Sequence, residues 1–67
     1  MTSKQSVGSE RLRVYRESMG YSQEKLGEFL NVSREYISML ENGERRPGRE
    51  LSYNIEKLAN IPMRSWR

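Results

Sequence analysis

The chain has 67 residues, enough for one small domain with a modest apolar core. It contains no Cys, His or Asp, which excludes disulfides, thiolate metal sites and the commonest general base. Its 9 acidic residues are therefore all Glu, and they are spread along the chain without a convergent pair. We expect neither an enzyme nor a metal or cofactor site.

The net charge is +3, and Arg is far commoner than Lys among the 12 basic residues. Arg favours bidentate recognition of phosphate groups and guanine edges. Three of these residues, Arg45, Arg46 and Arg49, lie close together in the sequence. No apolar run reaches the length of a membrane span and no signal peptide is evident, so we expect a cytoplasmic protein without a membrane partner.

The N-terminal part of the chain predicts an arm followed by a helix. Residues 1–8 are polar and lack helical periodicity, so we expect a flexible arm ahead of a folded domain over residues 9–67. Ser9 is expected to cap a first helix over residues 10–19, which Gly20 ends. The apolar stripe of this helix would consist of Leu12, Tyr15 and Met19.

Two helix starts of the same design follow. Ser22 is expected to cap a second helix over residues 23–30. Ser33 is expected to cap a third helix over residues 34–41. Hydrophobic staples would flank both caps, formed by Tyr21 with Leu26 and by Val32 with Ile37. Asn31 tolerates the left-handed conformation of a tight turn, so the segment predicts a helix-turn-helix, whose second helix suits the DNA major groove.

The C-terminal third predicts two more helical elements. Asn42-Gly43 ends the third helix, because both residue types accept positive φ. A fourth helix is expected over residues 49–59, with Asn60 as its stop. Its inward face would consist of Leu51, Ile55 and Leu58. Pro62 favours the first turn of a fifth element. The predicted class is all-α, a compact bundle of four to five helices.

The segment SQEKLGEFLNVSREYISMLENGERRP resembles the helix-turn-helix of the phage-repressor-like family, the lambda Cro and repressor type, also called the XRE family. The resemblance covers roughly residues 10–66. It implies a lambda-repressor-like bundle in which helices two and three form the motif, in a bacterial or phage-encoded protein that binds operator DNA as a homodimer. Gly27 departs from the usual Ala, and the apolar positions of helix four look one residue out of step.

The resemblance implies that the N-terminal half of helix three reads base edges. The candidate base contacts are Ser33, Arg34, Glu35, Ser38 and Met39. Arg34 can pair with guanine, and Glu35 can accept from a cytosine amino group or remain a solvated side chain that phosphates repel. Met39 or Tyr36 would pack on a thymine methyl group or on the sugar-phosphate wall.

The resemblance implies that a second set of residues contacts phosphates. It comprises Gln23, Tyr36, Asn42, Arg45, Arg46 and Arg49. Gln23 lies at the positive N-terminus of helix two, which favours an anion. Asn42 also has a structural role in ending helix three. Arg45 and Arg46 have no apolar or capping role, so phosphate contact is their better interpretation.

Four further residues are expected to act within or between protomers. The resemblance implies that Arg16 pairs with Glu41 in a partly buried salt bridge of structural role. Trp66 is expected either to complete the core or to lie in a dimer interface, and Tyr53 is a second interface candidate.

Together these features predict a sequence-specific DNA-binding transcriptional regulator, with repression favoured, acting as a dimer on a pseudo-palindromic operator through the major groove. No small-molecule ligand is evident. A restriction-modification controller, an antitoxin and the DNA-binding domain of a longer repressor remain alternatives. A protein-interaction module that has lost DNA binding is another. DNA affinity with steep salt dependence would separate this module from the others.

Overall fold

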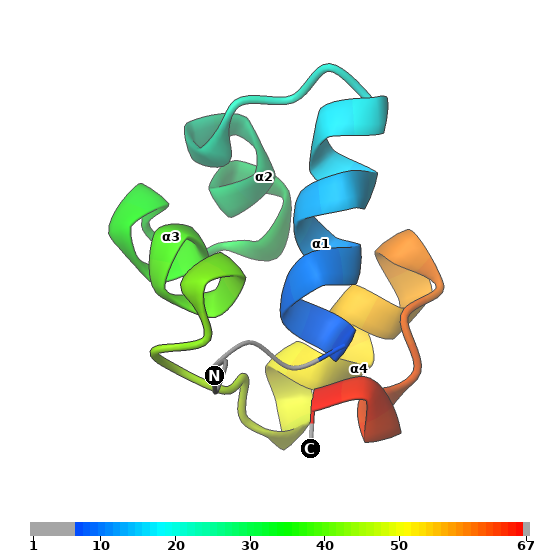
Figure 1. The fold of residues 1–67 in the computed structure, drawn as a ribbon. Coiled ribbons are helices and arrows are strands. Elements are labelled where there is room, and N and C mark those ends of the chain that lie inside the picture. The colour runs from blue at the N-terminus through cyan, green and yellow to red at the C-terminus, as the bar shows by residue number, and fades with distance from the viewer. Residues whose placement is uncertain (1–6, 67) are drawn as a thin grey trace, which may run out of the picture.

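The computed structural model describes residues 7–66 as a bundle of helices. The elements are α1 (Val7–Ser18), α2 (Gln23–Leu30), α3 (Arg34–Asn42), α4 (Arg49–Ala59) and the 3-10 helix η1 (Met63–Trp66). Figure 1 shows α2 and α3 together on one side of α1, with the end of α4 on the other. The described part of the chain contains no strand, which confirms the predicted all-α class.

Helix α1 begins earlier than predicted. It starts at Val7, so the expected boundary of the arm after residue 8 and the cap at Ser9 are wrong. Ser9 is a buried residue inside the helix. The reason is tertiary: Gly8 lies against the indole of Trp66, where an added Cβ would be 2.6 Å from the ring. Residues 1–6 of the predicted arm lie outside the described residues.

The predicted turn between the second and third helices is confirmed. The Ser22 hydroxyl accepts a hydrogen bond from the Lys25 backbone N–H at 3.0 Å. The Ser33 hydroxyl accepts one from the Tyr36 backbone N–H at 3.1 Å. Asn31 adopts φ 62°, in the left-handed region, and so ends α2 as expected. Because both caps and the turn residue form local contacts, sequence alone predicted them correctly.

Gly27 allows α2 and the following turn to approach closely. A Cβ at this position would lie 2.6 Å from the backbone carbonyl oxygen of Val32. The Val32 N–H in turn donates to the Gly27 carbonyl at 2.8 Å. A side chain here would therefore push the turn away from α2, which explains why a residue of the lowest volume lies inside a helix despite its low helix propensity.

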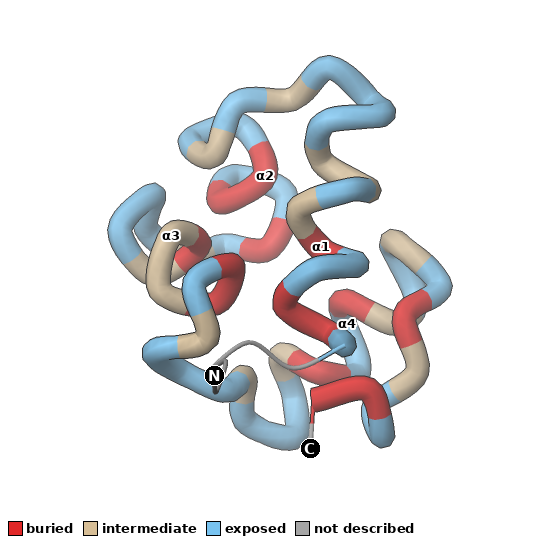
Figure 2. The backbone as a smooth tube through the Cα atoms, in the orientation of Figure 1, coloured by how far each residue is buried: buried red, intermediate tan, exposed pale blue. Residues whose placement is uncertain are grey.

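The core lies between α1, α2, α3 and the C-terminal segment. Its buried apolar residues are Leu12, Leu26, Leu30, Ile37, Leu40, Ile55, Ile61 and Trp66. Figure 2 shows the buried positions on the inner faces of the helices. Trp66 is only 4% exposed and belongs to this core, which is one of its two expected roles, and its role in a dimer interface stays a prediction. Met19 lies beyond the end of α1 and is half exposed, so it does not extend the predicted stripe.

Helix α4 has the predicted bounds but a different inward face. Ile55 is buried, whereas Leu58 is 38% exposed and Leu51 is only partly buried. Ser52 is buried instead, and its hydroxyl is 2.7 Å from the Gly48 carbonyl and 3.2 Å from the Pro47 carbonyl. These contacts satisfy the hydroxyl and attach the preceding loop to α4. The shift agrees with the mismatch noted in the sequence pattern.

Candidate nucleic-acid interface

The outward face of α3 is polar and accessible at its N-terminal end. Ile37, Leu40 and Glu41 are buried, so the opposite side of the helix faces away from the core. Ser33, Arg34 and Glu35 are exposed at the first turn, whereas Ser38 and Met39 are half-buried on the second turn. All five predicted base-contact residues therefore lie on or beside the accessible part of one short helix, where they can approach a common ligand.

Arg34 and Glu35 contact each other at the start of α3. The guanidinium Nη2 lies 3.3 Å from the Glu35 carboxylate, and both side chains are about two-thirds exposed. A hydrogen bond from the backbone N–H of Glu35, followed by the adjacent guanidinium, holds the pKa of the Glu35 carboxyl below its ordinary value. Such an exposed pair contributes little to stability, so Arg34 can exchange this contact for another acceptor at little cost.

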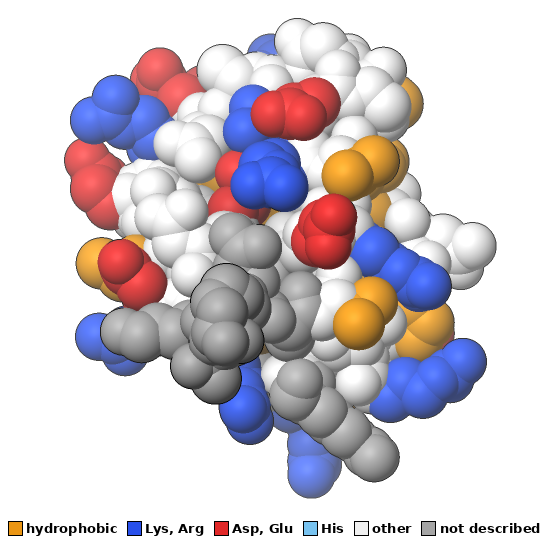
Figure 3. All heavy atoms as spheres, in the orientation of Figure 1, with side chains coloured by type: hydrophobic (Ala, Val, Ile, Leu, Met, Phe, Trp, Pro, Cys, Tyr) orange, Lys and Arg blue, Asp and Glu red, His pale blue; other side chains and the backbone are white. Residues whose placement is uncertain are grey.

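Basic side chains follow α3 directly. Gly43 adopts φ 80° and ends the helix, and the Glu44 N–H donates to the Met39 carbonyl at 2.9 Å. Arg45 and Arg46 are exposed in the following loop, and Arg49 is exposed at the start of α4. Figure 3 shows basic side chains along the lower edge of the view, near the α3–α4 loop and α4. The loop therefore continues the polar face of α3 with positive charge, which suits a phosphate backbone.

Asn42 and Tyr36 occupy the margins of this face. Asn42 is exposed in the last turn of α3, and its Nδ2 lies 3.5 Å from the Ser38 hydroxyl. Tyr36 is half-buried and packs against the core. Both stay predicted phosphate contacts, although Tyr36 offers only part of its side chain.

A charge network links α1, α2 and α3 behind this face. Arg16 Nε donates to Glu41 Oε2 at 2.7 Å and Arg16 Nη2 to Glu41 Oε1 at 3.1 Å, so the predicted pair is bidentate. Glu41 is only 3% exposed. The hydrogen bonds to this carboxylate raise the pKa of Arg16, against the opposing effect of burial. The network therefore fixes the position of α3 relative to the scaffold.

Gln23 belongs to the same network, which the sequence did not predict. Its Nε2 donates to Glu41 Oε1 at 3.2 Å. A carboxylate can only accept, so this bond orients the amide with its nitrogen toward α3. The amide nitrogen carries a second N–H, so the predicted phosphate contact stays compatible with this geometry. No sequence signal links positions 23 and 41, because their contact depends on the packing of two helices.

Comparisons with known proteins agree with this geometry. The helix-turn-helix family model matches residues 12–66. The chain is 42% identical over 57 residues to an uncharacterized HTH-type transcriptional regulator of Sinorhizobium medicae, and equally to one of Rhizobium meliloti. It is 35% identical over 57 residues to a putative HTH-type transcriptional regulatory protein of Pyrococcus furiosus. These alignments cover 85% of this chain but only 40%, 40% and 18% of the relatives.

Two solved structures share the fold. The restriction-modification controller protein C.AhdI from Aeromonas hydrophila superposes with a TM-score of 0.70 at 27% identity, covering 88% of this chain and 86% of that chain. The clp gene regulator ClgR from C. glutamicum superposes with a TM-score of 0.73 at 23% identity, covering 96% and 83%. The chain belongs to the XRE-type helix-turn-helix family. None of its helices between residues 7 and 66 is long and apolar enough to cross a membrane.

Proposed function

We propose that this protein is a sequence-specific DNA-binding regulator of transcription. The observation that carries the proposal is the accessible first turn of α3, followed directly by Arg45 and Arg46 in the next loop and by Arg49. A helix supplies side chains for base edges, and flanking Arg residues neutralise phosphates. The family membership and the names of the relatives support the same role. It requires no catalytic step, and its natural place is the cytoplasm.

The proposed mechanism divides the work between the two sets of residues. Phosphate contacts from Gln23 and the α3–α4 loop set the register, and α3 then selects the sequence through Arg34 and its neighbours. One short helix reads few base pairs, so a homodimer on a pseudo-palindrome is the economical arrangement, with half-sites about 34 Å apart. Repression would follow from competition with polymerase for the promoter.

A restriction-modification controller is the second candidate. One observation favours it: the fold superposes on C.AhdI with a TM-score of 0.70 at 27% identity. Such a protein would use the same DNA-binding surface, and the two candidates differ only in the genes that they regulate. A protein-interaction module without DNA binding is less favoured, because it would have no use for three exposed Arg residues beside α3.

Selection from a randomised duplex pool tests the proposal. We expect enrichment of an inverted repeat, and an affinity that falls by orders of magnitude between about 50 and 200 mM salt. Arg34→Ala should cost about 1–3 kcal/mol of binding free energy for each half-site and relax the preference at one base pair of each half-site. Arg45→Ala is the matched comparison. It should weaken binding to all sequences alike and reduce the salt slope by about 1 for each protomer, which is about 2 for the dimer.

Two outcomes would contradict the proposal. A pool with no enriched sequence and little salt dependence would exclude DNA recognition by this surface. Equal effects of Arg34→Ala and Arg45→Ala on every sequence would mean that α3 contacts phosphates only, and that base selection lies elsewhere.

A further inference from the structure

The first turn of α3 carries two side chains of opposite charge that contact each other. Arg34 and Glu35 are the first two residues of the helix, and Arg34 Nη2 lies 3.3 Å from Glu35 Oε2. Their side chains are 64% and 67% exposed, so this contact lies on the surface proposed to face DNA. An exposed pair of this kind contributes little to stability. Stability therefore does not explain an acidic side chain on a surface that must approach phosphates.

The end groups of the pair present hydrogen-bond donors followed by an acceptor. The guanidinium of Arg34 has five N–H donors, and the contact with Glu35 uses one N–H of Nη2. The other N–H of Nη2 and both of Nη1 stay available. A hydrogen bond from its own backbone N–H, followed by the Arg34 guanidinium, holds the pKa of the Glu35 carboxyl below its ordinary value. The carboxylate is therefore ionised near neutral pH and can only accept.

One of the four base pairs matches this order of donors and acceptor. Across the major groove, a G·C pair presents the acceptors N7 and O6 of guanine and then the N4 donor of cytosine. O6 and N4 are hydrogen-bonded to each other and lie about 2.9 Å apart. This spacing is close to the 3.3 Å between Arg34 Nη2 and Glu35 Oε2. An A·T pair alternates acceptor, donor and acceptor, so a guanidinium N–H and the carboxylate would each face a group of their own kind.

We propose that Arg34 and Glu35 recognise one G·C base pair as a unit, with the guanidinium on guanine N7 and O6 and the carboxylate on cytosine N4. The inference rests on the proposed function, because it specifies what the start of α3 recognises. Of the two roles expected for Glu35, base contact and solvated side chain, it selects the first. The guanidinium also neutralises the carboxylate, which allows Glu35 to enter a groove between two phosphate backbones.

Selection from the randomised pool with variants locates the base pair. At one position of each half-site, the wild type should require G·C in one orientation, because the reversed pair presents its donor first. Arg34→Ala and Glu35→Ala should both relax the preference at this same position. We call it the assigned pair. Two residues that contacted separate base pairs would instead relax two different positions.

The unit also predicts that Glu35 has opposite effects with and without Arg34. In the wild type, Glu35→Ala removes the cytosine contact and should weaken binding to the enriched duplex by about tenfold for each half-site. In the Arg34→Ala background, the carboxylate has lost its counter-charge and faces phosphates, so Glu35→Ala should strengthen binding several-fold. Fluorescence anisotropy with the wild type, both single variants and the double variant measures this reversal of sign.

Modified bases test the contact atom by atom. N4-methylcytosine keeps one amino hydrogen for base pairing and directs its methyl group into the major groove, so it removes the donor that Glu35 would meet. At the assigned pair, this base should weaken binding of the wild type by about tenfold for each half-site. Glu35→Ala should bind the modified and unmodified duplexes equally. 7-Deazaguanine lacks the N7 acceptor, so it should weaken the wild type and leave Arg34→Ala unaffected.

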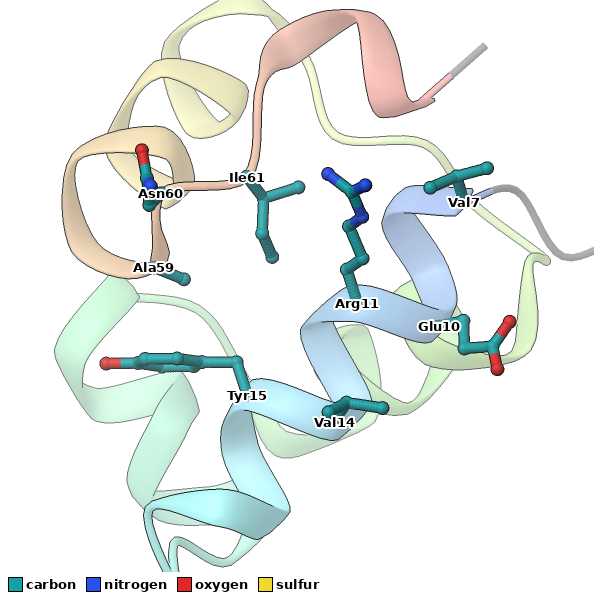
Figure 4. A pocket seen from close by; sticks show the side chains of 8 residues that line it. All are labelled: Val7, Glu10, Arg11, Val14, Tyr15, Ala59, Asn60 and Ile61. Atoms are coloured by element: carbon teal, nitrogen blue, oxygen red, sulfur yellow. The ribbon is translucent and has the colours of Figure 1, made fainter.

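Glu10→Ala is the matched control for Glu35→Ala. Glu10 is an exposed helical Glu, so its replacement changes the net charge by the same amount. Figure 4 shows it beside a groove of about 470 Å³, which is lined by residues of α1 and by residues 59–61. Glu10→Ala should change neither the affinity for the enriched duplex nor the effect of N4-methylcytosine. All these positions are exposed, so the circular dichroism spectra should stay helical.

Three results would overturn the inference while the DNA-binding function stands. In each of them, the pool still yields an enriched sequence. They are relaxation of different base pairs by Arg34→Ala and Glu35→Ala, a wild type that binds N4-methylcytosine duplexes normally, and stronger binding of Glu35→Ala in both backgrounds. The last result would mean that the carboxylate only repels phosphates. A pool without any enriched sequence would contradict the proposed function, and the inference together with it.

Discussion

Glu41 is an acidic side chain with only 3% of its surface exposed, held between three helices. Arg16 donates two hydrogen bonds to it, and Gln23 donates a third. Arg16 Nη1 also donates to the Tyr21 carbonyl at 3.0 Å, in the segment between α1 and α2. At the scale of single residues, this cluster is where the scaffold and the recognition helix depend most directly on each other. A carboxylate buried in this way is favourable only while its partners remain.

Because Arg16 and Glu41 form a buried pair, we expect strongly non-additive effects on the free energy of unfolding when one or both are replaced. Arg16→Met leaves Glu41 buried without its main partner and should lower the free energy of unfolding by about 3–5 kcal/mol. Arg16→Met/Glu41→Leu removes both charges and should be close to the wild type, apart from the bonds lost by Gln23 and by the Tyr21 carbonyl. Urea denaturation would give the free energy of unfolding of the wild type and of each variant. A loss below about 1 kcal/mol for Arg16→Met would mean that the pair is solvated.

The pH dependence of this pair has a definite sign. The pKa of Arg16 is raised in the folded state, so its contribution to stability is complete below its ordinary pKa and is lost only as the pH rises through the folded value. That value lies in the strongly alkaline range. The Arg16 guanidinium therefore adds no pH dependence of stability between about pH 5 and 9.

At the scale of elements, the turn between α2 and α3 determines how the two helices of the motif are oriented relative to each other. Asn31 adopts φ 62° and ψ 41°, and its N–H is bonded to carbonyls of the last turn of α2. Asn60 adopts φ 59° at the end of α4 in the same way. This conformation is unfavourable for a residue with a Cβ, and it is less unfavourable for Asn than for most residues because the short polar side chain of Asn forms local hydrogen bonds. The angle between the two helices of the motif depends on this single turn.

Substitutions at Asn31 test this account of the turn. Asn31→Ala should lower the free energy of unfolding by about 1 kcal/mol, and Asn31→Gly should leave it unchanged or raise it slightly. Asn54→Ala is the matched control, an exposed position inside α4 where Ala is the better helix former. Thermal unfolding followed by circular dichroism gives the comparison. Equal stability of Asn31→Ala and Asn31→Gly would show that the left-handed conformation carries no strain.

At the scale of the whole molecule, the main feature is a contact between the two ends of the described chain. Gly8, in the first turn of α1, lies against Trp66, the last residue of η1. Figure 1 shows the start of α1 beside η1. Trp66 is the largest side chain of the core and is almost fully buried. The bundle is therefore closed by a contact between residues near opposite ends of the sequence, and Gly8 supplies the space for the indole.

The substitution Gly8→Ala should have two opposing effects on the free energy of unfolding, and the sign of each is known. Helix propensity alone predicts stabilisation of about 1 kcal/mol. The added Cβ would lie 2.6–2.9 Å from atoms of the indole ring, and overpacking of this kind costs typically about 1–3 kcal/mol. We expect net destabilisation, together with a change in the fluorescence of Trp66. Ser18→Ala, at the exposed end of the same helix, should change stability by less than about 0.5 kcal/mol. A Gly8→Ala variant more stable than the wild type would contradict the close contact.

Local hydrogen bonding and local backbone conformation were determined by the sequence itself. The bounds of α2 and α4, the caps at Ser22 and Ser33, and the left-handed stops at Asn31 and Asn60 all agree with expectation. Each depends on residues within one or two turns of each other, and amino-acid type controls such contacts directly. The family resemblance added the pairing of Arg16 with Glu41, which spacing alone does not predict.

Tertiary structure alone decided the features that depend on distant parts of the chain. The early start of α1 and the burial of Trp66 follow from one contact between Gly8 and the indole. The inward position of Ser52 follows from the loop carbonyls that its hydroxyl meets, and the orientation of Gln23 follows from Glu41. Helical periodicity shows that a face exists but not which neighbour covers it. That choice is made by packing between segments far apart in sequence, where the volume available to each side chain is determined.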